Sequence, residues 1–445
     1  MRRWKYCFVL LGSLLLVGML CGCSVQSAEE LYALPRQSDV YYNLQQAIDR
    51  VMVNGASYAG PLTGSNQQAV QLADLDGDEQ DEAIVFVKTT GDKPLKAYIF
   101  DREADVFQNT AVIEGDGSDF DAVEYAQLDG EPGLEIIMGR RLSDQILQSL
   151  GVYAYRQQRH VELMSVNYSE FQVVDLDGDD RRDVFVLRTE TNERTGVAEI
   201  YRYENGLMER DQEASLSPGA KQIKRLLTGY VAQGIPAVFV ASVYEADTII
   251  TDIFAYVGQS FRNVAASQET GFSAQTVRNY HVYAADIDED GVIELPMPVV
   301  LPSATAANET FWTIDWYNLL PEGGRKIKMS TYHNYAAGWY LILPEQWYDQ
   351  LSISKGKEIA GVLGTVLSKW NGYGHETEEI LTIYSFTGED RLTLAQSEGR
   401  FLLAEKGEVA YSAQLGDCSF AQAMTQDDIK AMFRFIYLDW NTGET

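Results

Sequence analysis

Short runs of β-branched and aromatic residues recur along the middle of the chain, separated by turns rich in Asp and Gly. A first group occupies residues 83–87, 136–138, 184–187 and 237–241, and a second group follows at 96–100, 152–155 and 199–203. Apolar runs of this length, bounded by turn residues, are typical of β-strands. The pattern therefore predicts a series of small antiparallel sheets.

The two ends of the chain have a different pattern. From a Ser38 cap, apolar residues recur at helical spacing through Met52, which predicts a helix packed against the sheets. Strands are expected at 380–386, 401–404 and 409–413. The apolar spacing at 359–367 fits a helix, but Gly361 and Gly364 would each destabilise it by about 1 kcal/mol, so the secondary structure of this segment is left open. Thr425 and Asp428 form a capping box before an apolar face that reaches Trp440, which predicts a final helix. The region from 336 to 445 is therefore expected to be a small α+β domain.

Three nine-residue segments carry acids at positions 1, 3, 5 and 9. They are loop 1 (Asp74, Asp76, Asp78, Glu82), loop 3 (Asp175, Asp177, Asp179, Asp183) and loop 5 (Asp286, Asp288, Asp290, Glu294). Two weaker copies lie between them: loop 2 (127–135) begins with Gln127, and loop 4 (229–237) begins with Gly229 and has no acid. First positions at 74, 127, 175, 229 and 286 give intervals of 53, 48, 54 and 57 residues. This period is typical of a four-stranded propeller blade.

The acidic spacing has a chemical reason. Carboxylates at alternate positions of a tight turn can converge on a hard cation, a carbonyl at position 7 can add a ligand, and a carboxylate at position 9 can close the shell, which is calcium chemistry. An EF-hand would need a Glu at position 12, where this chain has Val85, Val186 and Met297. Solvated turns without metal are the alternative, because Asp and Gly suit such turns. Three copies in register favour the metal.

These loops resemble the calcium loops of the FG-GAP/VCBS repeat family, over roughly residues 65–330. The resemblance implies a β-propeller, here of about five four-stranded blades. It also implies three Ca²⁺ ions, held by the acids of loops 1, 3 and 5 with carbonyl oxygens of Gln80, Arg181 and Val292. Loops 2 and 4 lack the first Asp, so no strong ion is expected there. Calcium would be a structural staple rather than a catalyst.

The N-terminus has the pattern of an export signal. Arg2, Arg3 and Lys5 precede an apolar stretch at 8–20, which is too short to span a bilayer comfortably. The following Leu20–Cys23 resembles a bacterial lipobox, by which Cys23 would carry the lipid. An uncleaved anchor or an ordinary secretory signal is the alternative. We therefore expect a signal peptide at 1–22, a tether at 23–37, a propeller at 38–335 and the α+β domain at 336–445, attached by lipid to the extracytoplasmic face of the cell membrane.

Composition narrows the classes of function. The 445 residues include 65 acidic and 35 basic side chains, a formal charge of -30, which argues against nucleic acid as a partner. Cys418 is the single cysteine after Cys23, so the body of the chain cannot form an internal disulfide.

Motifs for catalysis are missing. The sequence has no zincin, P-loop, Rossmann or nucleophile-elbow motif, and its four histidines show no ligand spacing. Aromatic residues gather between Trp312 and Trp370, where core packing is the commoner explanation and ligand stacking in a cleft between the domains is the alternative. The sequence predicts a binding or scaffolding module for an unknown protein or carbohydrate rather than an enzyme. The alternative is a cell-surface hydrolase, for example on glycans, which would need a deep pocket with converging acids or histidines of shifted pKa.

Overall fold

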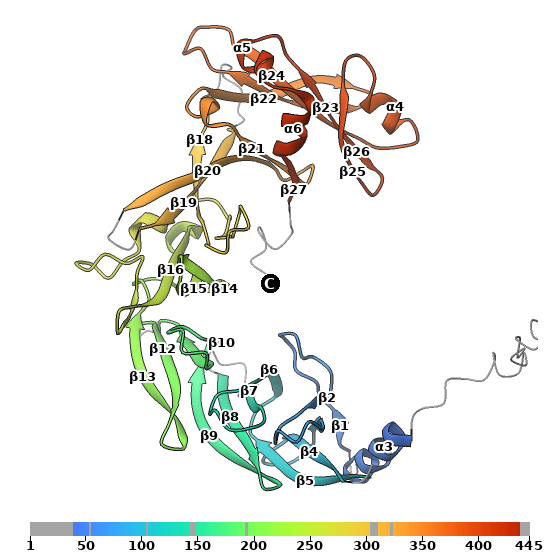
Figure 1. The fold of residues 1–445 in the computed structure, drawn as a ribbon, viewed down its shortest axis with the longest axis vertical. Helices are drawn as coiled ribbons and strands as arrows, with labels where there is room; N and C mark the ends of the chain where they lie inside the picture. The colour runs from blue at the N-terminus through green and yellow to red at the C-terminus, as the bar shows by residue number, and fades with distance from the viewer. Residues whose placement is uncertain are drawn as a thin grey trace, which may run out of the picture.

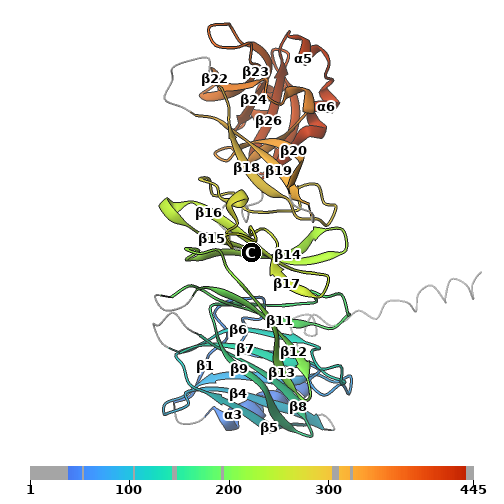
Figure 2. The same ribbon diagram turned by 90° about the vertical axis from the view of Figure 1, so that its left-hand side faces the viewer.

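The structure, a computed structural model, describes residues 39–52, 55–103, 106–142, 148–191, 195–302, 310–320 and 324–436. The fold is mainly β, as predicted, with six antiparallel sheets of four or five strands and few, short helices. Figure 1 shows the sheets following one another along an arc, and Figure 2 shows the strands up to β13 at one end of the long axis and the C-terminal strands at the other. The predicted signal peptide, Cys23 and the tether lie outside the described residues.

Four sheets in chain order make up the N-terminal part of the arc. Sheet I contains β1 (Ser57–Tyr58), β2 (Val70–Ala73), β3 (Glu82–Lys88), β4 (Leu95–Glu103) and β5 (Val106–Gly115). Sheet II contains β6 (Asp119–Ala126), β7 (Glu135–Arg141), β8 (Gln148–Arg156) and β9 (Arg159–Tyr168). Sheet III contains β10 (Glu170–Val174), β11 (Asp183–Arg188), β12 (Val197–Glu204) and β13 (Leu207–Ser215). Sheet IV contains β14 (Ile223–Ala232), β15 (Ile235–Val243), β16 (Ile249–Val257) and β17 (Ser260–Asn263).

The other two sheets and the remaining helices follow. Sheet V contains β18 (Leu295–Val300), β19 (Trp312–Leu319), β20 (Arg325–Asn334), β21 (Trp339–Leu343) and β27 (Phe433–Phe435). Sheet VI contains β22 (Leu351–Ile359), β23 (Val362–Lys369), β24 (Glu378–Phe386), β25 (Phe401–Lys406) and β26 (Val409–Leu415). The helices are α3 (Asp39–Val51), α4 (Arg391–Ala395), α5 (Ser419–Gln422) and α6 (Gln426–Met432), with single 3-10 turns at Glu245–Asp247, Ala274–Thr276 and Glu345–Trp347.

Each repeat of the sequence corresponds to one sheet, because successive strands pair as antiparallel neighbours. The runs predicted as strands at 83–87, 136–138, 184–187 and 237–241 are β3, β7, β11 and β15, each of which pairs with the strand before it in the chain. The runs at 96–100, 152–155 and 199–203 are the strands that come next, β4, β8 and β12. Loops 1, 2 and 3 connect β2 to β3, β6 to β7 and β10 to β11. Acids that recur along the sequence therefore recur at the same corner of successive sheets.

Successive sheets pack face to face through apolar side chains. Ile84 and Phe86 of β3 join a buried cluster with Phe120 and Ile136 of sheet II. Equivalent clusters fill the space between sheets II and III, between III and IV, and between IV and V. Because strand side chains alternate between faces, the β-branched runs serve two cores at once. The sheets are thus held in line by side-chain packing between neighbours.

Helix α3 covers the outer face of the first sheet, as expected for the N-terminal helix. Leu44, Ala47 and Ile48 pack against Ala83, Val85 and other outward-facing apolar residues of sheet I. Without this cover the terminal sheet would expose an apolar face to water. Helix α3 therefore closes the N-terminal end of the stack.

The C-terminal region resolves one segment that the sequence left open and differs from the prediction for the final helix. Residues 359–367 form the β22–β23 hairpin, whose turn at Ala360 and Gly361 has positive φ values of 49° and 82°. The final helix, which begins at the predicted Thr425–Asp428 capping box, ends at Met432 rather than near 440. Phe433 then begins β27, which pairs with β21. The ring of Phe433 packs against Trp339. Tertiary pairing with an open sheet edge thus overrides the helical periodicity. Sheet V consequently contains strands from both sides of residue 336.

No helix among the described residues is long and apolar enough to cross a membrane.

Candidate metal centres

Loops 1, 3 and 5 have strands beside them, which agrees with the rejection of an EF-hand. Loop 1 connects β2 to β3 and loop 3 connects β10 to β11, while loop 5 is closed by an antiparallel bridge between Ala285 and Glu294 before β18 begins. Each loop therefore connects two backbone segments that are paired with each other. The acids at its corner are held in place by the sheet rather than by flanking helices.

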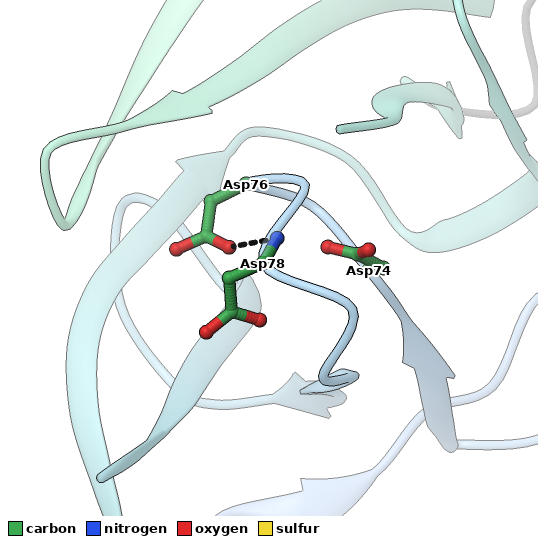
Figure 3. A group of neighbouring side chains, drawn as sticks. All are labelled: Asp74, Asp76 and Asp78. Atoms are coloured by element: carbon green, nitrogen blue, oxygen red, sulfur yellow. Dashed lines mark hydrogen bonds between the residues drawn. The ribbon is translucent and has the colours of Figure 1, made fainter. Parts of the chain in front are cut away.

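In each of the three loops, the acids at positions 1, 3 and 5 converge. One carboxylate oxygen from each member of a triad lies within 4.8 Å of the others: Asp74, Asp76 and Asp78; Asp175, Asp177 and Asp179; Asp286, Asp288 and Asp290. Figure 3 shows the loop 1 triad gathered around its tight turn. Oxygen atoms at this separation can share one hard cation of the size of Ca²⁺. These nine acids are the ones at positions 1, 3 and 5 of the repeated segments, and the chemistry of the donors fits a calcium ion.

The backbone of the loops explains how the triads converge. In loop 1, positions 4 and 6 are in the left-handed region, with φ of 78° at Gly77 and 67° at Glu79. Loop 3 repeats these values, and loop 5 has the same two positions left-handed although its glycine stands at position 6 (Gly291, φ 86°). The position 1 carboxylate accepts two backbone N–H groups across the turn, such as those of Gly77 and Glu79 on Asp74 at 2.7 and 3.1 Å. The turn itself thus aims the acids inward.

The acid at position 9 sits deeper than the other three. Glu82 and Asp183 begin β3 and β11, Glu294 directly precedes β18, and all three are at most 4% exposed. One oxygen of Glu82 accepts the N–H of Leu75 at 2.7 Å, and Glu294 accepts the N–H of Ile287 in the same way at 3.2 Å. These carboxylates brace the loop from below. None of the three belongs to a converging triad.

Burial raises the pKa of all three position 9 carboxyls. Desolvation is the main cause in each case, and the pKa rises to about 8 for Glu82 and to about 7 for Asp183 and Glu294. Negative neighbours add to the effect at Glu82, where Asp76 and Asp101 oppose ionisation. Carboxyls crowded and buried in this way gain from a nearby cation, which favours their charged form.

Side chains of the protein supply positive charge to loops 3 and 5. Arg202 on β12 contacts Asp177 at 2.9 Å and Asp183 at 3.2 Å, and the Nζ of Lys328 on β20 lies 2.8 Å from Asp288 and 2.5 Å from Asp290. Neither cation was predicted from the sequence, because both come from strands further along the same sheet. Their strand register was the only signal that could have found them.

Loop 2 keeps the frame of a metal loop but fills its centre with nitrogen atoms. The N–H of Leu128 donates to Glu135 at 2.7 Å and that of Gly130 donates to Gln127 Oε1 at 2.6 Å, as in loop 1. The amide nitrogen of Gln127 donates to the carbonyl oxygens of positions 5 and 7, and Arg156 forms an ion pair with Asp129. No strong ion was expected in loop 2, and its oxygens are already engaged by protein donors.

Loop 4 has become a tight hairpin. Its first residue, Gly229, lies within β14, and β15 begins at Ile235 after a two-residue turn. Its residues do not belong to any acidic group found among the described parts of the chain.

The remaining predicted ligands contribute in another way. The backbone N–H groups of Gln80, Arg181 and Val292 donate to the position 5 carboxylates at 2.8, 2.9 and 2.9 Å. Their carbonyl oxygens stay predicted ligands. Desolvation is the largest single effect on the Asp179 carboxyl and raises its pKa. The hydrogen bonds and charge of Arg181, whose side chain lies 2.7 Å away, together outweigh desolvation, so the pKa of Asp179 is lowered.

A separate cavity lies along the first strands of sheets II, III and IV. Its volume is about 980 Å³, and it is lined by the segment before β2 together with β6, β10 and β14. Asp121 is occupied there, accepting Arg141 Nε at 2.8 Å and the Tyr168 hydroxyl at 2.7 Å. Glu124 and Glu170 also line the cavity, and desolvation raises the pKa of both, that of Glu170 to about 7 with help from Asp121.

Ligand stacking by the central tryptophans is excluded. Trp316, Trp339 and Trp347 are at most 1% exposed and pack in the cores of sheets V and VI. The core-packing explanation therefore holds for these three.

No family model and no curated protein matches the chain. Among solved structures, a protein from Lactobacillus plantarum is 9% identical with a TM-score of 0.31, over 72% of this chain and 86% of that one. Sqt1 from Chaetomium thermophilum is 13% identical with a TM-score of 0.30, over 67% of this chain and 72% of that one. These scores are too low to carry an argument about fold or function.

Proposed function

We propose that the protein is a lipid-anchored, calcium-binding β-propeller of the FG-GAP/VCBS type that acts as a binding or scaffolding module on the extracytoplasmic face of the membrane. The observation that carries the calcium assignment is the recurrence of three converging Asp triads at the same corner of three sheets. Solvated turns alone do not require acids at the same three positions with the same left-handed backbone.

The sheet arrangement supports the propeller. Four consecutive sheets are antiparallel meanders packed face to face, and the first strands of sheets II, III and IV line one common cavity. First strands that face a common axis are a property of propeller blades. Sheet V, with loop 5 at its start, would be the fifth blade.

Calcium in these loops would stabilise the fold. At a free concentration about tenfold above the dissociation constant, one ion contributes about 1.4 kcal/mol, and three contribute about 4 kcal/mol. Because a whole domain is stable by about 5–15 kcal/mol, the ions would decide whether the array survives outside the cell.

Calorimetric titration of residues 24–445 with CaCl2 tests the metal assignment. We expect binding at three sites in the wild type, and the loss of one site in each of Asp76→Ala, Asp177→Ala and Asp288→Ala. Asp116→Ala, which removes an exposed acid outside the loops, is the matched control and should bind as the wild type does. A wild type that binds no calcium would refute the proposal.

Anchoring is tested separately. Mass spectrometry of the membrane-extracted protein should find an N-terminal diacylated Cys23, and Cys23→Ser should release the protein from the membrane fraction. An unmodified Cys23 in the mature protein would contradict the anchor.

A cell-surface hydrolase is the second candidate, and the cavity between sheets favours it. Glu124 and Glu170 are two carboxyls of raised pKa in one concave site, which is the pattern expected of an acid and a base. Release of reducing sugar from cell-wall glycans, abolished by Glu124→Gln or Glu170→Gln but retained by the exposed control Glu209→Gln, would identify an enzyme. Glycan binding without turnover would identify the module.

A further inference from the structure

We propose that side chains on later strands of each sheet rank the loops by calcium affinity: loop 1 binds most tightly, loops 3 and 5 bind more weakly against a tethered protein cation, and loop 2 binds none. This inference rests on the proposed calcium function and adds its regulation by the chain's own cations.

Loop 2 shows how the protein replaces an ion. The amide nitrogen of Gln127 donates to the carbonyl oxygen of Gly133 at 3.0 Å and to that of Glu131, while Arg156 pairs with the position 3 acid Asp129. The position 7 carbonyl is one of the oxygens that a cation would contact, and in loop 2 the amide nitrogen of Gln127 already donates to it. The loop is therefore complete without metal.

Loop 3 is only partly satisfied by its tethered cation. Arg202 follows Tyr201, which pairs with Val184 across the sheet, and its guanidinium reaches both Asp183 and Asp177. Asp183 is nevertheless 4% exposed with its Oδ2 accepting no hydrogen bond from the described residues. A buried carboxylate oxygen without a donor is costly, and a cation is the ligand that would satisfy it. Calcium can thus bind in loop 3, but in competition with the guanidinium.

Loop 5 has the same arrangement with a different cation. Asn318 stands in the cross-strand position and donates to Glu294 at 2.7 Å, while Lys328 reaches Asp288 and Asp290 from the next strand. The ammonium holds two of the three triad acids. An ion that uses these acids must displace it.

Loop 1 has an acid where loop 3 has its arginine. Asp101 follows Phe100, which pairs with Ala83 across the sheet, and its Oδ2 accepts the neutral amide of Gln158 at 3.1 Å. No Lys or Arg within the described residues forms an ion pair with an acid of loop 1. Loop 1 therefore combines the most negative charge with no internal competitor, and an external cation meets the least opposition there.

The test uses proteins in which one loop remains intact. Asp177→Ala with Asp288→Ala leaves loop 1 intact. Asp76→Ala with Asp288→Ala leaves loop 3 intact, and Asp76→Ala with Asp177→Ala leaves loop 5 intact. Calorimetric titration with CaCl2 should rank loop 1 as tightest.

The cause of the ranking is tested within single loops. In the protein that retains loop 3, Arg202→Gln should raise calcium affinity about tenfold or more, because a positive charge in contact with two ligands is removed. Arg182→Gln removes the same charge from an exposed position in loop 3 and should change affinity much less. In the protein that retains loop 5, Lys328→Gln should tighten binding by a similar factor, and it provides a second test if the Arg202 variant unfolds.

The outcomes separate the two proposals. If no single-loop protein binds calcium, the proposed function fails. If calcium binds but loop 1 is not the tightest, or Arg202→Gln and Lys328→Gln bind no tighter than their parents, the proposed function stands and the ranking by tethered cations is overturned.

Discussion

Replacement of Gln127 by aspartate tests the idea that an amide nitrogen stands in for an ion. The side-chain amide of Gln127 donates two hydrogen bonds inside loop 2, to the carbonyl oxygens of Glu131 and Gly133. In Gln127→Asp both donors are lost and a carboxylate faces the two oxygens, although the N–H of Gly130 keeps an acceptor, as it has on Asp74 in loop 1. Two hydrogen bonds at about 0.5–1.5 kcal/mol each, together with the new repulsion, predict a loss of about 2–3 kcal/mol without metal.

Calcium should recover much of this loss, because the substitution recreates an acid at position 1 beside Asp129 and Glu135. Urea unfolding of residues 24–445 in chelator and in millimolar calcium measures both effects. Gln127→Ala is the matched control, since it loses the same donors but gains no ligand, and calcium should not restore it beyond the gain seen in the wild type. Equal recovery of the two variants would refute the reasoning. Combination with Arg156→Gln should enlarge the recovery of Gln127→Asp by removing the competing cation from Asp129.

Three further predictions concern stability. Asp252 is fully buried and accepts four hydrogen bonds of 2.6–2.9 Å. Asp252→Ala should therefore lower the free energy of unfolding, measured in urea, by about 3–5 kcal/mol. Asp116→Ala, at an exposed position, should change it by less than about 0.5 kcal/mol. A Cβ at Gly133, where φ is 102°, would lie 2.3 Å from a backbone oxygen of loop 1. Gly133→Ala should therefore lower the free energy of unfolding by more than about 1 kcal/mol and weaken calcium binding at loop 1. Unchanged calcium titrations would show that the two loops are independent. Burial lowers the pKa of His333 to about 3, so the native state keeps it neutral while the unfolded state takes up a proton below about 6.5. The free energy of unfolding should therefore decrease as the pH is lowered from about 6.5 towards 3. His333→Gln should reduce this decrease by about 2 kcal/mol between pH 6.5 and 5, measured by urea unfolding at each pH. Parallel pH profiles would contradict this.

The strands and the acid triads were predictable because their signals are local. A run such as 83–87 is apolar on both faces and bounded by turns, and the Asp-x-Asp-x-Asp spacing carries its own turn geometry in the left-handed residues between the acids. The Thr425–Asp428 capping box was predictable for the same reason, since its two hydrogen bonds join residues three apart.

The end of α6 could not be predicted in this way. Periodicity continued the helix past Phe433, but the open edge of β21 and the ring of Trp339 take that residue into a strand. An unpaired sheet edge is a long-range feature, and pairing with it outweighs local helical preference.

The order of the residues along the chain was enough to indicate a β-rich repeat whose turns carry oxygen ligands, because turn chemistry and alternation act over a few neighbouring residues. Which charge each turn meets was decided by folding. Asp101 and Arg202 stand 19 residues after the position 9 acids of their loops, and only the hairpin register brings each beside its loop. The same holds for the cavity along β6, β10 and β14, whose acids come from two different sheets. Electrostatic interactions depend on distance in space, so the balance of charge in each loop follows from strand pairing rather than from the loop's own composition.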